Sequence, residues 1–179
     1  MNILAFGASA SAHSINKQLA HYTANQFDGH TLAMIDLIDY SLPLYTIDLE
    51  RASGIPQTAH DFLEKVNWAD LIIISLAEHN GSYTAWFKNL FDWTTRINGK
   101  FLENKKVFLL STSPGARGGL SVMGHALDRF PRHGAVIIGS FSLPNFNENF
   151  SLDKGVMHEQ LALEYRSTLE QVKTLIFLP

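Results

Sequence analysis

Five short apolar segments, separated by stretches with helical spacing, constrain the fold of this chain more than any other feature. Each is too short for a helix and is rich in the Ile, Val, Leu or Phe typical of strands. Because their apolar residues do not alternate with polar ones, both faces should be buried, as in a parallel sheet. The segments are Ile3–Phe6, Thr31–Ile35, Leu71–Ser75, Val107–Leu110 and Ala135–Ile138, and Thr31–Ile35 has the weakest pattern.

Apolar residues at helical spacing fill the intervals between these segments. Long patterns run from Ile15 to Phe27, Phe87 to Thr94 and Leu161 to Ile176, and shorter ones cover His60–Val66 and Leu120–Phe130. Strand and helix therefore alternate along the chain. This alternation predicts an α/β fold, a doubly wound five-stranded parallel sheet with helices on both faces.

The composition favours one domain, residues 1–179, and excludes several classes of protein. With 14 Lys and Arg, 17 Asp and Glu and a net charge of −3, the chain lacks the basic surface of a nucleic-acid binder. Because it has no cysteine, it has no disulfide, thiol nucleophile or iron–sulfur cluster, and a reducing cytoplasm is the expected location. We expect neither a signal peptide nor a membrane anchor, since no suitable basic or long apolar segment is present. The eight histidines show no compact ligand spacing, so no metal site is expected.

The loop after the first strand, Gly7–Asn16, suits a phosphate group. Ser9, Ser11 and Ser14 offer hydroxyl donors, and the N-terminus of the following helix adds N–H groups with partial positive charge. The loop matches neither the dinucleotide pattern G-x-G-x-x-G nor a Walker A sequence. The alternative is a serine-rich turn in which Ser14 only caps the helix.

The loop after the third strand, Leu76–Thr84, combines a tight turn with two titratable side chains. Asn80 and Gly81 favour a turn with positive φ. The adjacent Glu78 and His79 either form an acid–base pair or, as is more common, belong to an ordinary polar turn.

The loop after the fourth strand, Ser111–Gly119, contains three glycines and three hydroxyl side chains. Such a loop offers an adaptable rim of backbone donors for the polar edge of a planar heterocycle. The alternative is a flexible crossover loop. All three loops lie at carboxyl ends of strands, where ligands bind in doubly wound sheets.

Together the three loops resemble the NADPH-dependent FMN reductase family, flavodoxin-like oxidoreductases that include quinone, chromate and azo reductases. The first loop is similar to the family pattern G-S-x-R-x-x-S-x-N. The second is similar to P-E-Y-N-G-S, here Ala77–Ser82, and the third to S-x-S-P-G-x-x-G-G, here Ser111–Gly119. The resemblance runs from Met1 to the final helix and implies a flavodoxin-like fold.

Three positions depart from the family patterns. Ser11 stands where the family usually has arginine, Ala77 replaces proline and His79 replaces tyrosine. Without that arginine, the helix dipole, hydroxyl groups and N–H groups would balance the nearly two negative charges of an FMN phosphate. His79 can stack as a tyrosine does, and imidazole titrates near neutral pH.

The resemblance implies a site for noncovalent FMN built from all three loops, with no catalytic side chain, because the flavin carries the hydride chemistry. Each loop would contact one part of the cofactor. The phosphate would be held by Ser9, Ser11, Ser14, Ile15 and Asn16, the N5 and O4 edge by Glu78, His79, Asn80, Gly81 and Ser82, and the pyrimidine side by Ser113, Gly115, Arg117, Gly118 and Gly119.

The implied function is an FMN-dependent NAD(P)H oxidoreductase. Hydride would pass from NADPH or NADH through the flavin to small acceptors such as quinones, free flavin or azo compounds, by a ping-pong mechanism. One alternative is a flavodoxin-type electron carrier for protein partners, although carriers are usually strongly acidic and this chain is not. The other is a domain of the same fold that binds a ligand other than flavin. Ser11, in place of the family arginine, keeps this alternative open.

The helical pattern around Phe87–Thr94 is aromatic on more than one face, with Trp86, Phe87, Phe91 and Trp93. One face fits the core. We expect the other to be exposed and to form a contact of a homodimer or homotetramer near the second loop, as the family's dimers suggest.

Two other segments are expected to be irregular. Asp39–Gln57, with two prolines and a glycine, should form a long surface loop. Phe141–Phe150 should be a loop that packs its phenylalanines inward, and the alternative is that it edges the flavin site of the same or a neighbouring subunit.

Overall fold

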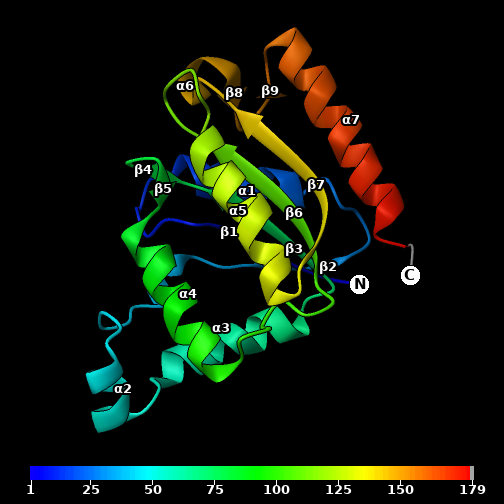
Figure 1. Ribbon diagram of the computed structural model, residues 1–179. Helices are drawn as coiled ribbons and strands as arrows, with labels where there is room; N and C mark the ends of the chain where they lie inside the picture. The colour runs from blue at the N-terminus through cyan, green and yellow to red at the C-terminus, as the bar shows by residue number, and fades with distance from the viewer. Residues whose placement is uncertain (178–179) are drawn as a thin grey trace.

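The computed structural model, which describes residues 1–177, is built on a parallel sheet of five strands in the order β2-β1-β3-β6-β7 (Figure 1). All four strand pairs are parallel. The order confirms the predicted doubly wound, flavodoxin-like sheet and places the reversal between β1 and β3. The strands are β1 (Asn2–Gly7), β2 (Thr31–Met34), β3 (Leu71–Leu76), β6 (Lys106–Thr112) and β7 (Val136–Leu143).

Burial differs between the centre and the edges of this sheet. β3 is buried along its whole length, and β1 and β6 are buried apart from their first residues. In the edge strands β2 and β7, many residues are exposed or only partly buried. Because an edge strand has a neighbour on one side only, the weak apolar pattern of Thr31–Ile35 follows from its position.

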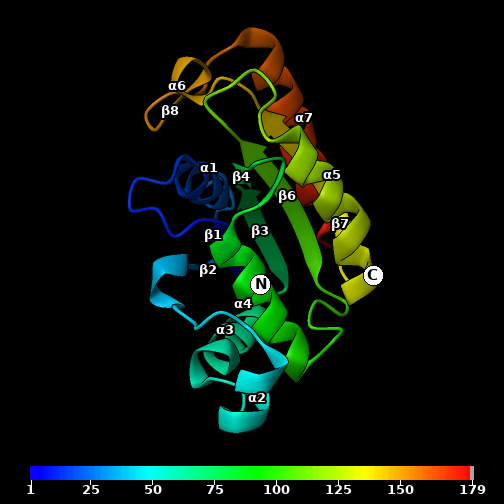
Figure 2. The same cartoon turned by 60° about the vertical axis from the view of Figure 1, so that its left-hand side comes forward.

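Helices cover both faces of the sheet (Figures 1 and 2). The helices α3, α4 and α5 enclose one apolar core, and α1 and α7 enclose the other. Every predicted helix is present, with ends shifted by a few residues. Their bounds are α1 (Ile15–Ala24), α3 (Gln57–Trp68), α4 (Ala85–Ile97), α5 (Leu120–Arg129) and α7 (Glu159–Leu175). Within residues 1–177 none of the helices has the length and apolar character needed to cross a bilayer.

The predicted long loop Asp39–Gln57 is partly wrong, because it contains the helix α2 (Ile47–Ser53) and follows a short 3-10 helix, η1 (Leu37–Asp39). Thr46 caps α2 by accepting a hydrogen bond from the N–H of Leu49. The helix buries no residue of its own, so it lacks the apolar face that a sequence pattern would reveal. It is attached to α4 through Glu50, which accepts from Arg96 Nε at 2.8 Å.

The expected exposed aromatic face of α4 is also wrong. Trp93 is completely buried and donates from Nε1 to the carbonyl of Pro43 at 2.8 Å. Trp86 donates to the carbonyl of Leu37 at the same distance. Asn89, between them, bonds to the backbone of the same segment at Leu42, Pro43 and Tyr45. The second aromatic face of α4 therefore holds the segment after β2 instead of a partner subunit.

The segment Phe141–Phe150 packs its phenylalanines inward, as predicted. Phe141, Phe146 and Phe150 are all buried. They extend the core beneath α7. Between β7 and α7 the chain forms the short helix α6 (Phe146–Asn149) and a hairpin of β8 (Phe150–Ser151) and β9 (Gly155–Val156).

Candidate active site

Three loops meet at the carboxyl ends of β1, β3 and β6 around a cleft of about 270 Å³. Their convergence confirms that the three segments singled out in the sequence share one place in the fold. The cleft is lined by Ser9, Ser11, His13, Ser14, Ile15 and Asn16 from the first loop, Ala77, Glu78 and His79 from the second, and Thr112, Ser113 and Pro114 from the third.

Gly7, at the end of β1, allows α1 to begin directly against the sheet. A Cβ added to Gly7 would lie 2.3 Å from the backbone nitrogen of Lys17 and 2.7 Å from the carbonyl carbon of Asn16. Backbone atoms cannot yield to such a contact as a flexible side chain can. Glycine at this position therefore determines where the N-terminus of α1 stands relative to the strands.

Asn16, in the first turn of α1, joins the central strands through its buried side chain. Its Oδ1 accepts from Ser75 Oγ at 2.7 Å and from the N–H of Thr112 at 3.1 Å. Its Nδ2 donates to the carbonyl of Thr112 at 3.1 Å. Because Oδ1 and one N–H of Nδ2 are engaged with the central strands, the backbone N–H of Asn16, in the first turn of α1, is the group that fits the predicted phosphate contact.

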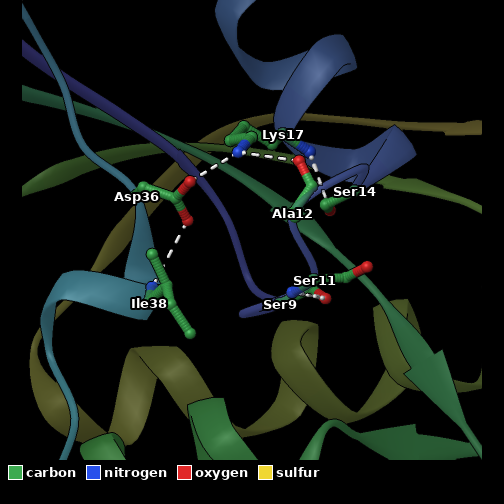
Figure 3. A network of polar contacts seen from close by, with 7 residues as sticks. All are labelled: Ser9, Ser11, Ala12, Ser14, Lys17, Asp36 and Ile38. Atoms are coloured by element: carbon green, nitrogen blue, oxygen red, sulfur yellow. Dashed lines mark hydrogen bonds and ion pairs between the residues drawn. The ribbon is translucent and has the colours of Figure 1, made fainter.

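The first loop places the hydroxyl groups of Ser9, Ser11 and Ser14 in the lining of the cleft. Ser14 Oγ accepts from the N–H of Lys17 at 3.1 Å and caps α1, and Ser9 Oγ accepts from the N–H of Ser11 at 3.2 Å (Figure 3). These two hydroxyl oxygens are thus used as acceptors, which leaves their O–H groups free to donate. Within residues 1–177 the N–H groups of Ile15 and Asn16 have no acceptor, as expected for the first turn of a helix. This donor set fits a phosphate group.

Lys17, the cation nearest to this loop in sequence, is engaged elsewhere. Its ammonium group lies 2.5 Å from Asp36 Oδ2 and donates to the carbonyl of Ala12 at 3.3 Å (Figure 3). Burial alone raises the pKa of Asp36, but the hydrogen bonds from Lys17 and from the N–H of Ile38 outweigh it and lower the pKa overall. The ion pair ties α1 to the segment after β2.

The second loop forms a small hairpin of β4 (Glu78–His79) and β5 (Ser82–Tyr83). Its turn has positive φ at Asn80 (51°) and Gly81 (77°), as predicted. Burial raises the pKa of Tyr83 to about 12.

Glu78 fixes the hairpin to the neighbouring helix. Its Oε2 accepts from the N–H of Val122, in the first turn of α5, at 2.9 Å. A carboxylate at this position is stabilised by the partial positive charge of the helix N-terminus. His79 is exposed, and no hydrogen bond joins it to Glu78 within the described chain. The geometry thus gives Glu78 a structural contact instead of a place in an acid–base pair.

The third loop is held by the end of β7, in contrast to a freely flexible crossover. The Oγ atoms of Ser111 and Ser142 each donate to the carbonyl of Gly118 at 2.8 Å. The N–H of Asn145 donates to the carbonyl of Gly115 at 3.0 Å. Gly118 has φ of 58°, and a Cβ there would lie 2.7 Å from Ser142 Oγ, so only glycine fits.

The predicted site residues fall into two groups. Those that line the cleft are Ser9, Ser11, Ser14, Ile15, Asn16, Glu78, His79 and Ser113. The others lie in the same loops but outside the lining, namely Asn80, Gly81, Ser82, Gly115, Arg117, Gly118 and Gly119. Four lining residues were missing from the sequence prediction, His13, Ala77, Thr112 and Pro114, and each is adjacent to a predicted one.

The comparisons with known proteins agree with this geometry. A family model described as NADPH-dependent FMN reductase matches residues 1–148. The chain belongs to this family. Residues of the family's three loop patterns therefore meet in one cleft of this structure.

Two of the curated relatives with named activities are bacterial reductases. A 2-hydroxy-1,4-benzoquinone reductase of Burkholderia sp is 33% identical over 114 residues, which are 63% of this chain and 60% of that protein. An FMN-dependent NADPH-azoreductase of Staphylococcus haemolyticus is 33% identical over 112 residues, 60% of this chain and 57% of that protein. The matched segments thus span less than two thirds of either relative.

The fold is shared with solved flavoenzymes. The NAD(P)H:(acceptor) oxidoreductase FerB of Paracoccus denitrificans superposes with a TM-score of 0.76, covering 98% of this chain and 96% of that one at 22% identity. At this identity the likeness establishes the flavodoxin-like architecture.

Proposed function

We propose that this protein binds FMN noncovalently in the three-loop cleft and passes hydride from NAD(P)H to small acceptors such as quinones or azo compounds. The observation that carries the proposal is the set of free donors that the first loop brings to the cleft, in a chain that belongs to the FMN reductase family. The quinone and azo reductases among the relatives support the acceptor class.

The first loop would hold the phosphate through hydroxyl groups of Ser9, Ser11 and Ser14 and the N–H groups of Ile15 and Asn16. Both N–H groups belong to the first turn of α1, where the helix dipole favours an anion. The hydrogen bonds of the Asn16 side chain to Thr112 and Ser75 keep these donors at a constant position relative to β3 and β6.

The second and third loops would position the ring system. Glu78 would orient the hairpin through its bond to Val122. In the third loop, the N–H groups of Arg117 and Gly119 have no acceptor within residues 1–177 and would donate to the ring edge that gains negative charge on reduction. Bound FMN would supply the hydride chemistry, which requires no acid or base from the chain.

Absorbance spectroscopy of the purified protein tests the proposal. After incubation with FMN and removal of excess ligand, the protein should retain a visible flavin band that NADPH or NADH bleaches without air. A quinone should restore the band, and initial rates should follow a ping-pong pattern. A protein that retains no FMN would contradict the proposal, and one that retains FMN but reacts with neither nucleotide would be a carrier.

We also propose a homodimer, with its contact on α5 beside the cleft. Leu120 and Leu127 are 55% and 42% exposed and lie seven residues apart, on one face of the helix. Gly124 lies between them on the same face, and a Cβ there would meet nothing within 4 Å. Glycine in a helix costs about 1 kcal/mol relative to alanine, which is offset when a partner backbone approaches closely.

Light scattering tests the homodimer. The wild-type protein should have twice the 20.0 kDa mass of one chain at micromolar concentration. Leu127→Glu should give the single-chain mass, and Leu163→Glu, at an exposed leucine of α7, should stay dimeric. A wild-type monomer would refute the proposal.

We propose a cytoplasmic location, because a cysteine-free chain that uses NAD(P)H suits a reducing compartment. Cell fractionation tests this, and recovery from an extracellular or membrane fraction would refute it.

A further inference from the structure

The cleft has donors that suit a phosphate group but little positive charge to attract it. No lysine or arginine is among its lining residues, and Glu78 contributes a carboxylate. A phosphate monoester carries nearly two negative charges at neutral pH. Hydroxyl groups, N–H groups and the helix dipole stabilise this charge, but none of them carries a full positive charge.

The nearby permanent cations have other partners. Lys17 is paired with Asp36 at 2.5 Å and also donates to the carbonyl of Ala12. Arg117 donates from Nη2 to Ser121 Oγ at 3.1 Å and does not line the cleft. The groups in the lining that can become cationic are the imidazoles of His13 and His79.

These two histidines occupy different sides of the cleft. His13 belongs to the first loop and directly precedes Ser14, the cap of α1, and it lines the cleft together with Ile15 and Asn16, whose backbone N–H groups have no acceptor within residues 1–177. His79 lies in β4, on the second loop. Both are exposed, and within residues 1–177 neither side chain has a hydrogen-bond or ion-pair partner.

We propose that the protonated imidazole of His13 is the cationic ligand of the FMN phosphate in this protein, so that cofactor affinity depends on pH. The inference rests on the proposed FMN function and adds the group that recognises the phosphate. The charged and titratable groups around His13 are His79 and Glu78 across the cleft and the Lys17–Asp36 pair at the base of the loop. Glu78 is directed to α5 by its bond to Val122.

The sign of the pH dependence follows from the chemistry of the two partners. Only a protonated imidazole is cationic, so the attraction to phosphate is present at the acid end of the titration and is lost at the alkaline end. The phosphate gains its second charge near about pH 6. Its own titration therefore strengthens binding as the pH rises, and a fall in FMN affinity must come from the protein.

Titration of flavin fluorescence with FMN and with riboflavin tests the proposal, because riboflavin has the same ring but no phosphate. The ratio of the riboflavin Kd to the FMN Kd measures recognition of the phosphate. In the wild-type protein we expect this ratio to fall about tenfold between about pH 6 and about pH 8, as for the loss of one charge-assisted hydrogen bond. In His13→Gln the ratio should be small and independent of pH.

Two variants serve as controls. His79→Gln removes the other imidazole and should retain the pH-dependent ratio. Ser11→Arg combined with His13→Gln places a permanent cation in the same loop and should restore a high ratio without pH dependence. Each substitution is at an exposed side chain that makes no hydrogen bond within residues 1–177, so folding should be unaffected.

The outcomes separate this inference from the proposed function. If neither flavin binds at any pH, the FMN proposal itself fails. If FMN binds and the ratio is unchanged in His13→Gln, the role of His13 is refuted. A ratio that stays constant to about pH 8 in the wild type would assign the phosphate to a permanent cation such as Lys17 and would also refute it.

Discussion

Two sets of polar side chains around the cleft differ in their hydrogen bonding. The inner set, Asn16, Ser75 and Thr112, is buried and hydrogen-bonded within itself. The outer set, Ser11, His13 and His79, lines the same cleft as Asn16 and Thr112 but is exposed, and within residues 1–177 its side chains make no hydrogen bond. Both sets consist of polar residues near the carboxyl ends of β1, β3 and β6, so their polarity alone does not separate them.

The difference separates residues that position the loops from residues that are free to bind a ligand. Buried polar groups cost stability unless they are paired, and the inner set pairs them across α1, β3 and β6. This pairing fixes the positions of the loops before any ligand arrives. The outer set keeps its donors for the ligand, which would bind with little rearrangement.

The strongest test of this division removes the centre of the inner set. Asn16→Ala would leave Ser75 and both backbone groups of Thr112 without their partner in a buried place. We expect the free energy of unfolding in urea to fall by about 3 kcal/mol, with loss of FMN binding. The exposed Asn25→Ala at the end of α1 is the control and should change it by less than about 0.5 kcal/mol. Equal losses of unfolding free energy in the two variants would show that the buried hydrogen bonds of Asn16 do not stabilise the loops.

A smaller loss of stability is expected from the contact between the hairpin and α5. Glu78→Ala removes the acceptor for the N–H of Val122 and should lower the free energy of unfolding by about 1 kcal/mol. Glu78→Gln keeps an acceptor oxygen and should lose less than half of that amount. If the two variants are equally destabilised, the bond to Val122 does not hold the hairpin.

The Lys17–Asp36 pair, which is partly exposed, should contribute less again. Asp36→Asn should lower stability near neutral pH by about 0.5 kcal/mol, because solvent screens such pairs. The pKa of Asp36 is lowered in the folded protein, so its contribution is complete above the ordinary value of 3.8 and disappears as the pH falls below it. Urea titrations of both proteins from neutral to acid pH should therefore converge. A difference that persists in acid would contradict the ion pair.

The outer set should give the smallest change in stability and a clear change in affinity. Ser11→Ala should alter the free energy of unfolding by less than about 0.5 kcal/mol and weaken FMN binding by about threefold to tenfold. Urea denaturation and flavin titration of one preparation measure both quantities. A destabilised Ser11→Ala protein would show that the two sets do not differ as described.

The sequence predicted the sheet because its central strands are buried on both faces, and the loops because their patterns resemble a family. It could not predict contacts between distant segments. The chain alone does not show that Trp86 and Trp93 meet the carbonyls of Leu37 and Pro43, so their faces were interpreted as exposed.

The same limit applies within the site. Asn16 stands at a position of the family pattern, which predicts a phosphate ligand. Its side chain instead forms hydrogen bonds to Thr112, which lies 96 residues further along the chain. His13 stands at a position that the family pattern leaves unspecified, and only the fold shows that it lines the cleft. Short α2 was missed because it has no buried face.

A crystal structure of the protein with FMN tests the central claim most directly. The account predicts that phosphate oxygens lie about 2.7–3.2 Å from the N–H groups of Ile15 and Asn16, with the ring between the second and third loops. The inner set should keep its present hydrogen bonds. A phosphate bound away from the first loop, or a flavin bound outside this cleft, would contradict the account.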